Sequence, residues 1–400
     1  MRALGDTLPE DSTIEPARKA PDLPVVSGRA ILGYFLRLGT LGFGGPIALA
    51  GAMHRDLVET KRWVTEAEYR DGLALSQLAP GPLAAQLAIY LGWIRGRVVG
   101  ATLAGVGFVL PSFLMVLGLA VLYVRVGGLP WIRGVFYGVS AAVIAIILRS
   151  VAKLARATLA RDPLLWTLFL VSAMVTIVTA AEIVWVFLAA GLVTVLVRHG
   201  RGAKAAGAAC ISWPLVLWAS APSTPSVLWE IVWYFGEASL FVFGSGLAIV
   251  PFLHAGVVET RGWLTEQQFL DAVAVAMITP GPVVITVAFI GFLVAGVAGA
   301  FAAAFGMFLP TYLVVLLAAP YYDRLRSNRP VRAFVDGITA ATAGGIAGAA
   351  VILGRNALYD WPAWLLAAST LALLLRTRLP EPMLIVGAGV VGLVIRAAAG

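Results

Sequence analysis

Long apolar stretches without charged residues follow one another along almost the whole of this chain. A helix needs about 20 mostly apolar residues to cross a bilayer. We count thirteen candidate spans, several of them short, centred near residues 42, 83, 110, 141, 172, 190, 214, 240, 283, 307, 342, 369 and 389. Only 12% of the 400 residues are charged, about half the share found in soluble domains. The sequence therefore predicts an all-α polytopic membrane protein with about 13 transmembrane segments.

The basic residues lie mainly in the loops between these stretches. They give a net charge of +8, but they form no continuous basic face with interleaved aromatic residues, so we expect no nucleic-acid partner. With the N-terminus inside, the inside loops hold 20 of the 29 Lys and Arg residues and the outside loops hold 8. Membrane proteins show this bias. We predict a multi-pass protein of the cytoplasmic (inner) membrane, with the lipid bilayer as partner and a cytoplasmic N-terminus.

The chain contains an internal duplication. Residues 43–82 align with residues 243–282 without a gap, with 15 identities in 40 positions, including both Pro-Gly-Pro triplets. Because the first candidate span corresponds to the eighth, an odd offset, the two repeats are predicted to have inverted topology. We divide the chain into a disordered cytosolic tail (1–30), an N-terminal repeat (31–205) and a C-terminal repeat (206–400).

Both repeats interrupt a membrane helix at its middle. Pro80, Gly81 and Pro82 lie near the centre of one span, and Pro280, Gly281 and Pro282 lie at the matching place. Proline removes a backbone donor, and the freed polar groups are tolerated in a membrane only where protein or water surrounds them. A packing kink is one explanation. Matching interruptions in two inverted halves instead indicate the binding site of a transporter.

A second interruption, Gly-rich, occupies residues 42–51 and is mirrored at residues 242–251. If helices restart after Gly45 and Gly81, their N-termini present free N–H groups and the positive end of the helix dipole, which suits an anion. Small polar side chains near the breaks are candidates to bind an oxyanion: Ser76, Gln77, Gln86, Ser245, Thr279 and Thr286.

Arg37 and Glu237 occupy the same repeat position, and a charge within a membrane span is a functional hypothesis by default. They can neutralise each other, or Arg37 can hold an oxyanion while Glu237 carries a proton. Arg37 also lies close enough to the span's end for its side chain to reach the headgroups. We keep all three interpretations, with Arg37 among the substrate-binding candidates and Glu237 among the proton-coupling or gating candidates.

One histidine in each half, His54 and His254, is followed by two glutamates, and these residues are further candidates for proton coupling or gating: Glu59, Glu66, Glu259 and Glu266. Their spacing matches no zinc motif, and Cys210 is the only cysteine, so we expect no metal and no cofactor. The segment from Glu59 to Gly72 reads as an interfacial helix, with Thr65 as its N-cap and Glu68 as the capping-box partner. Structural anchoring is the alternative role for the cluster.

No stretch of the sequence shows an enzyme motif in the secondary structure or with the spacing that the motif needs. The glycine-serine run at residues 244–246 lies inside a span rather than on a strand-turn-helix elbow, and residues 200–204 lack the spacing of a phosphate-binding loop. We expect no enzyme and no ATP hydrolysis, so transport would draw on an ion gradient. A membrane-embedded enzyme acting on a lipid phosphate is the less favoured alternative.

The ordered set of motifs resembles the chromate ion transporter family in its long, duplicated form. The set comprises FGGP from Phe43, the stretch from Glu59 to Pro82, and GATLAGVGFVLPSF from Gly100, each with a weaker copy in the second half. The resemblance implies two homologous halves of opposite orientation and export of chromate, driven by the membrane potential or a proton gradient, which gives chromate resistance. Sulfate is the related oxyanion.

Carried onto this chain, the family's glycine-proline motifs fall on Gly44, Gly45, Pro46, Pro80, Gly81 and Pro82, with Gln86 following. The second half departs from them, with Ser245-Gly246 in place of Gly45-Pro46. A transporter of sulfate or another oxyanion with the same fold is the alternative function. Oligomeric state, a homo-oligomer included, is left open.

Overall fold

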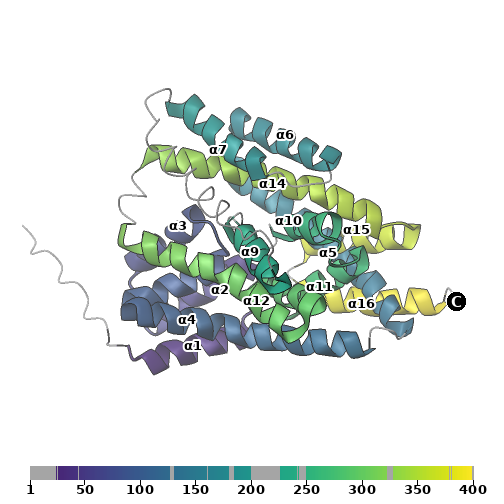
Figure 1. The fold of residues 1–400 in the computed structure, drawn as a ribbon, viewed down its shortest axis with the longest axis horizontal. Coiled ribbons are helices and arrows are strands. Elements are labelled where there is room, and N and C mark those ends of the chain that lie inside the picture. The colour runs from purple at the N-terminus through teal and green to yellow at the C-terminus, as the bar shows by residue number, and fades with distance from the viewer. Residues whose placement is uncertain are drawn as a thin grey trace, which may run out of the picture.

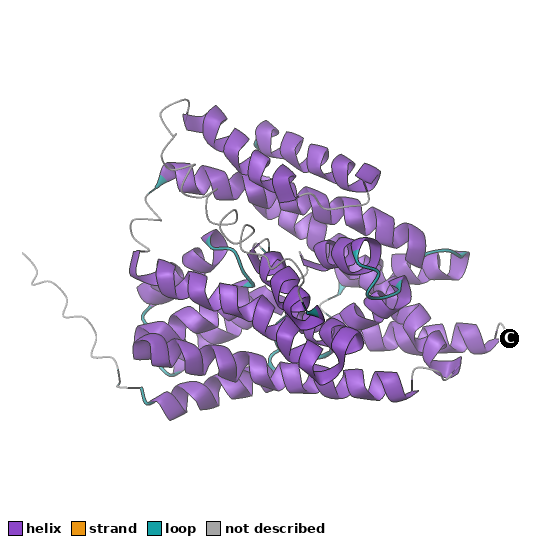
Figure 2. Cartoon of the chain, viewed as in Figure 1, coloured by secondary structure: helices purple, strands orange, loops and turns teal. Residues whose placement is uncertain are grey.

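The computed structural model describes residues 24, 26–43, 45–126, 130–159, 161–179, 184–199, 226–240, 242, 249–321, 328–377, 379 and 381–398. All regular structure in these ranges is helical (Figures 1 and 2). Most of the predicted tail lies outside the described residues, but the first helix already begins at Gly28, within the predicted limits of the tail.

The helices follow the duplication seen in the sequence. The first half contains α1 (Gly28–Leu41), α2 (Gly45–Met53), the π-helix η1 (His54–Thr60), α3 (Glu66–Leu78), α4 (Leu83–Val126), α5 (Pro130–Leu159), α6 (Pro163–Thr179) and α7 (Val184–His199). The second half contains α9 (Val227–Leu240), α10 (Val250–His254), η4 (Ala255–Thr260), α11 (Glu266–Ile278), η5 (Val283–Ile285), α12 (Thr286–Ala318), η6 (Ala319–Tyr321), α14 (Arg329–Ala357), α15 (Trp361–Arg376) and α16 (Glu381–Ala398).

Local sequence signals explain where several helices begin. Thr65 caps α3 in a capping box with Glu68, as predicted, and Thr265 and Gln268 repeat it at α11. Each box satisfies backbone N–H groups that the first turn of a helix leaves without partners. The predicted helix start at Thr65 is therefore confirmed, and the second repeat has the same device.

The helices α4 and α12 are each a pair of helices joined by a sharp turn. Non-helical backbone occurs at Gly96 and Arg97 in α4 and at Ala295 and Gly296 in α12. Glycines on either side of each turn let the two arms touch: a Cβ on Gly92 would overlap the carbonyl of Gly100, and Gly291 meets Gly299 in the same way. Each of these elements therefore supplies two of the candidate spans.

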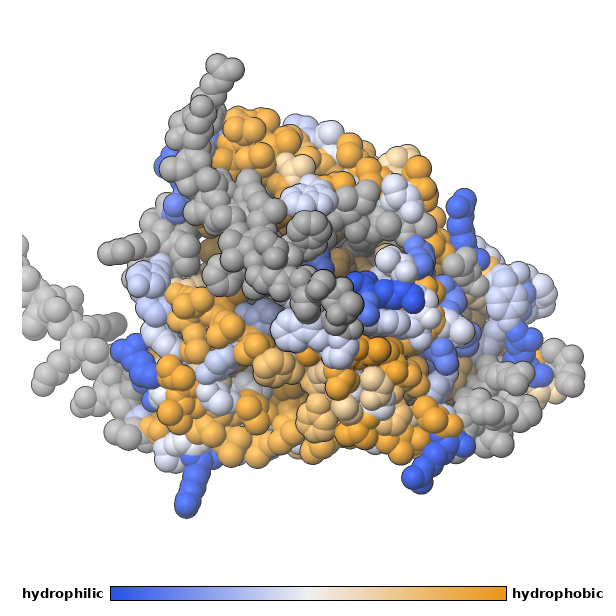
Figure 3. Space-filling model, in the orientation of Figure 1, coloured by the Kyte–Doolittle hydropathy of each residue, from blue (hydrophilic) through white to orange (hydrophobic). Residues whose placement is uncertain are grey.

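The described chain has the surface of a membrane protein. Five helices are long and apolar enough to cross a bilayer, and three shorter apolar helices accompany them. Large apolar side chains such as Leu114, Val178 and Leu365 are exposed, and apolar patches cover much of the face shown in Figure 3. The chain is an all-α polytopic membrane protein, as predicted.

The two halves are interlaced. The long helix α5 of the first half packs against α15 and α16 of the second half, whereas α14 of the second half packs against α6 and α7 of the first (Figure 1). Glycines allow these contacts: a Cβ on Gly138 of α5 would overlap the carbonyl of Ala388 on α16, and one on Gly344 of α14 would overlap that of Phe169 on α6. Each long helix is therefore completed by the other half.

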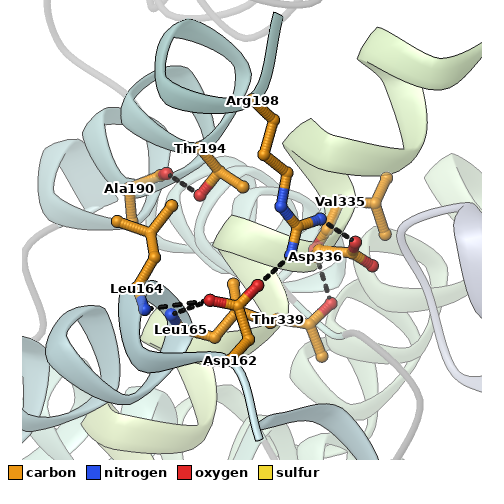
Figure 4. Close-up of polar contacts among 9 residues, drawn as sticks. All are labelled: Asp162, Leu164, Leu165, Ala190, Thr194, Arg198, Val335, Asp336 and Thr339. Carbon is orange, nitrogen blue, oxygen red and sulfur yellow. Dashed lines mark hydrogen bonds and ion pairs between the residues drawn. The ribbon is translucent and has the colours of Figure 1, made fainter. Parts of the chain in front are cut away.

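An arginine joins three elements at one end of this arrangement. Arg198, at the end of α7, donates to Asp162 and, at 2.7 Å, to Asp336 on α14 (Figure 4). Asp162 also accepts the N–H of Leu164 at 2.9 Å at the start of α6. The hydrogen bond from Arg198 holds the pKa of Asp162 below its ordinary value. This network links α6, α7 and α14.

We expect Arg198→Met to lower the free energy of unfolding by about 1–2 kcal/mol, because it leaves two carboxylates without their cation. The lowered pKa means that the stabilisation is present above the ordinary pKa of aspartate, about 3.9, and is lost as the pH falls through the lower value. Thermal unfolding in detergent over a pH series measures the difference, with exposed Arg156→Met as control. A gap between wild type and Arg198→Met that stays constant into strong acid would contradict this account.

Candidate functional site

The two Pro-Gly-Pro triplets break helices as predicted. α3 ends at Leu78 and α4 begins at Leu83, while α11 ends at Ile278 and a helical turn resumes at Val283. The glycine in each triplet has positive φ, +135° at Gly81 and +102° at Gly281. Side chains disfavour this backbone conformation, so glycine is required at both positions.

Each triplet is hydrogen-bonded to the other half of the molecule. The N–H of Gly81 donates to the carbonyl of Val242 at 2.7 Å, and the N–H of Gly281 donates to the carbonyl of Gly42 at 2.8 Å. Gly42 directly follows α1, and Val242 lies two residues after the end of α9, so both acceptors belong to the first break of their half. Each Pro-Gly-Pro break is therefore joined to the first break of the other half. We call these four residues, Gly42, Gly81, Val242 and Gly281, the junction.

Buried hydroxyl groups surround the junction. A Cβ on Gly281 would overlap the Ser112 side chain, and one on Gly81 would lie 2.9 Å from Oγ1 of Thr311. Ser112 donates to the carbonyl of Gly39 at 3.3 Å, and Thr311 pairs with the hydroxyl of Ser239 at 2.9 Å. The three hydroxyl-bearing side chains, Ser112, Ser239 and Thr311, are fully buried.

Gln86 adds an amide to the same place. Its Nε2 donates to the carbonyls of Ala79 at 3.2 Å and Pro80 at 2.6 Å, which the break has freed. Its Oε1 is buried and has no hydrogen-bond partner among the described residues. A buried acceptor without a partner is unfavourable, so this oxygen is suited to a hydrogen-bond donor.

The helices that restart at the breaks direct their N-termini toward this region. α2 begins at Gly45 and α4 at Leu83, directly after their breaks, as predicted. The first N–H groups of a helix have no carbonyl partner in their own helix, and they carry partial positive charge. Together with the hydroxyl groups they can donate hydrogen bonds to the oxygens of an anion.

The remaining predicted binding residues are placed unequally. The hydroxyls of Ser76, Thr279 and Thr286 are buried and each donates to a carbonyl three or four residues earlier, namely Gly72, Ala276 and Val283. Gln77 is exposed. The prolines of both triplets lie at the breaks, Pro46 lies in the first turn of α2, and Gly44 and Ser245 lie outside the described residues.

Arg37 and Glu237 do not form an ion pair in the described chain. Arg37 is exposed on α1 and Glu237 is partly buried on α9. Arg261 has an electrostatic effect on Glu237, but it pairs with Glu230 at 3.1 Å. The structure therefore does not show Arg37 neutralising Glu237. The other two interpretations of Arg37, oxyanion binding and contact with the headgroups, stay predictions.

In each half the predicted histidine lies between its two glutamates and contacts both. We call each set of three residues a histidine bridge. His54 contacts Glu59 at 3.1 Å through Nδ1 and Glu66 at 2.8 Å through Nε2, and His254 contacts Glu259 and Glu266 at 3.4 and 2.7 Å. Two such contacts require a proton on each ring nitrogen or a protonated glutamate. The bond from His54 lowers the pKa of Glu66, whereas burial raises that of Glu259.

The two carboxylates of each bridge bind opposite sides of the ring and do not converge. Across the part of the chain that the structure describes, no group of three or more His, Cys, Asp and Glu is arranged to hold a metal ion. The bridges tie the π-helical turns η1 and η4 to the starts of α3 and α11. Proton coupling or gating by these residues stays a prediction.

The sequence analysis missed the hydroxyl groups around the junction. Ser112 follows Pro111 and Thr311 follows Pro310, so the repeat alignment already placed them at equivalent positions. What it could not show is that each lies against the Pro-Gly-Pro glycine of the other half. Asp271 was also missed, although Asp71 occupies its position in the first repeat.

Comparison with known proteins identifies the family. The family model described as chromate transporter matches residues 29–195 and again residues 229–393. The chain belongs to the chromate transporter family. The resemblance drawn from the sequence motifs is confirmed, and it holds in both halves, although the exact limits of the two predicted repeats stay predictions.

Several members of the family are similar over most of their length. The chromate transport protein of Cupriavidus metallidurans is 54% identical over 391 residues, which cover 96% of this chain and 97% of that protein. The probable chromate transport protein of Synechococcus elongatus is 52% identical over 379 residues, 93% and 96% of the two chains. The chromate transport protein of Pseudomonas aeruginosa is 34% identical over 352 residues, 83% and 82%. No solved structure matches this chain. Relatives named as transport proteins indicate a transporter rather than an enzyme.

Proposed function

We propose that this protein exports chromate across the cytoplasmic membrane, with the dianion bound at the junction. The observation that supports this most directly is the pair of crossed hydrogen bonds, Gly81 to Val242 and Gly281 to Gly42. They bring helix N-termini, buried hydroxyls and the amide of Gln86 together between the halves. The family membership supplies the substrate.

The tetrahedral anion would accept hydrogen bonds from the N-terminal N–H groups of α2 and α4 and from Ser112, Ser239 and Thr311. Arg37, on the exposed side of α1, would attract the anion toward its path rather than contact it at the junction. Movement of one half relative to the other would expose the site to each side in turn. The histidine bridges and Glu237 would act in proton coupling or gating.

Export of a dianion uses the membrane potential directly. An inside-negative potential favours outward movement of each negative charge by about 2.3 kcal/mol per 100 mV, and so roughly 4.6 kcal/mol for two charges. This is sufficient for export without ATP and lowers cytoplasmic chromate, which would give resistance. Uptake of sulfate through the same site would have to overcome this electrical free energy.

Radiolabelled chromate uptake into inside-out vesicles tests the function. Wild-type protein is expected to accumulate chromate when a potential is imposed, with sulfate added as competitor to measure selectivity. Absence of chromate movement in folded protein, with and without the potential, would refute the assignment. Movement of sulfate instead of chromate would mean that the same site binds sulfate.

In the same vesicles we expect Gln86→Glu to reduce chromate transport at least tenfold. The substitution preserves side-chain shape but removes the donor that Ala79 and Pro80 accept from. It also places a negative charge beside the proposed site, and like charges brought together in a buried site cost several kcal/mol. Gln77→Glu is the matched control, because this glutamine is exposed at the end of α3. Equal rates for Gln86→Glu and Gln77→Glu would exclude Gln86 from the site.

A further inference from the structure

An aspartate outside the proposed site joins the two halves. Asp271 on α11 is 2% exposed. Its Oδ1 accepts from Nε2 of Gln267 at 2.8 Å, and its Oδ2 accepts from the hydroxyl of Tyr123 at 2.7 Å. Tyr123 lies near the end of α4, in the first half. The bond therefore depends on how α4 and α11 lie relative to each other.

No cation whose side chain the structure describes compensates this carboxyl group. Among the described residues no ion pair reaches Asp271, and its two partners are neutral. The other charged and titratable groups on elements packed against α11, where their side chains are described, are paired elsewhere or exposed. They are His254 on α10, with Glu259 and Glu266; Tyr137, Arg149, Lys153 and Arg156 on α5; Glu381 and Arg396 on α16; Tyr312 on α12; and Tyr90, Arg95, Arg97 and Arg125 on α4.

A buried carboxylate without a cation is strongly disfavoured relative to its neutral acid. The partners of Asp271 accommodate both forms. When the group is ionised, Tyr123 donates to Oδ2. When a proton from water binds Oδ2, the acid donates and the tyrosine oxygen accepts, because a phenolic hydroxyl can do either. The hydrogen bond between the halves survives the change with its direction reversed.

The position of Asp271 couples it electrostatically to the junction. α11 continues from Asp271 to its C-cap Thr279, beside the second Pro-Gly-Pro triplet, about 12 Å along the axis at ~1.5 Å per residue. An ionised Asp271 would repel a bound dianion through a buried, weakly screening interior. Binding of the anion must therefore favour the protonated form, and protonation must favour anion binding to the same degree.

We propose that Asp271 is a proton-binding site that takes up one proton from water when an oxyanion binds at the junction. The inference rests on the proposed function for the identity of the anion, but the proton site stands on its own contacts. Tyr123 is a positioning residue, since it acts through Asp271. The protein with a bound dianion is then less negative by one charge.

Infrared difference spectroscopy of the full chain in lipid, over a pH series, tests the proton site without substrate. A protonated carboxyl band that titrates with pH is expected in wild type, absent in Asp271→Asn and retained in Asp162→Asn. In Tyr123→Phe its midpoint should move to higher pH, because the ionised form loses a donor. If Asp271→Asn does not fold, the shift of the midpoint in Tyr123→Phe alone tests the proton site. A band unchanged in Asp271→Asn, or unshifted in Tyr123→Phe, would overturn the proton site.

Chromate is then added over a pH range in which it stays a dianion. The midpoint of the Asp271 band is expected to rise by at least one pH unit in wild type, equivalent to a tenfold gain in proton affinity. An unchanged midpoint in protein that transports chromate in vesicles would overturn the coupling. An unchanged midpoint in protein that transports no chromate would instead refute the proposed function, and the substrate-free titration would still decide the proton site.

Discussion

Gly281→Ala should abolish transport and destabilise the protein by roughly 2–5 kcal/mol, from backbone strain and overpacking together. At φ +102° a side chain is strained whatever the space around it, and here the new Cβ would also overlap the Ser112 side chain. Relief of that overlap would pull the Gly281 N–H away from the Gly42 carbonyl, which it contacts at 2.8 Å. The substitution therefore opens the junction itself.

Chromate uptake in vesicles and thermal unfolding in detergent measure the two effects. Gly262→Ala is the matched control: it also has positive φ, +58°, but nothing lies within 4 Å of its added Cβ, so only backbone strain applies. Ser112→Gly combined with Gly281→Ala should recover part of the loss, because it removes the overlapping side chain. Wild-type transport by Gly281→Ala would show that the crossed bonds are not needed.

Gly138→Leu is expected to prevent accumulation of folded protein. An added Cβ would overlap the carbonyl of Ala388 and lie 2.9 Å from Cα of Gly392, both on α16. These atoms are backbone and cannot move aside without displacing the helix. Separation of α5 from α16 would expose the side chains buried between the halves, which include Ile144 and Ile385.

Size-exclusion chromatography of detergent-extracted protein measures the outcome as loss of the monodisperse peak. Gly387→Leu on α16 is the control, since nothing lies within 4 Å of its Cβ position. A monodisperse Gly138→Leu protein with wild-type thermal stability would mean that the α5–α16 contact is not essential to the fold.

The sequence was most informative where a local pattern has a local cause. The apolar stretches predicted the helices, Thr65 with Glu68 predicted a helix start, and the Pro-Gly-Pro triplets predicted breaks. Proline and glycine act on their own backbone, so these consequences can be seen in a few residues.

The sequence could not predict which distant segments pair with one another. The bond from Gly81 to Val242 depends on two breaks meeting between the halves. Arg37 and Glu237 share a repeat position, but equivalent places in two repeats need not be adjacent in space, and no ion pair joins these two. Asp271 gave no signal of its own, because its tyrosine partner comes from α4 and its burial from the helices packed around α11.

The interlacing of the halves also determines the order in which the molecule can be completed. α5 leaves the ribosome long before its packing partners α15 and α16, which begin only at Trp361 and Glu381. Until α15 and α16 are synthesised, the face of α5 that carries Gly138 must contact lipid or an insertion chaperone. The first half cannot finish folding during its own synthesis, so removal of α15 and α16 alone should disrupt the part of the protein made earlier.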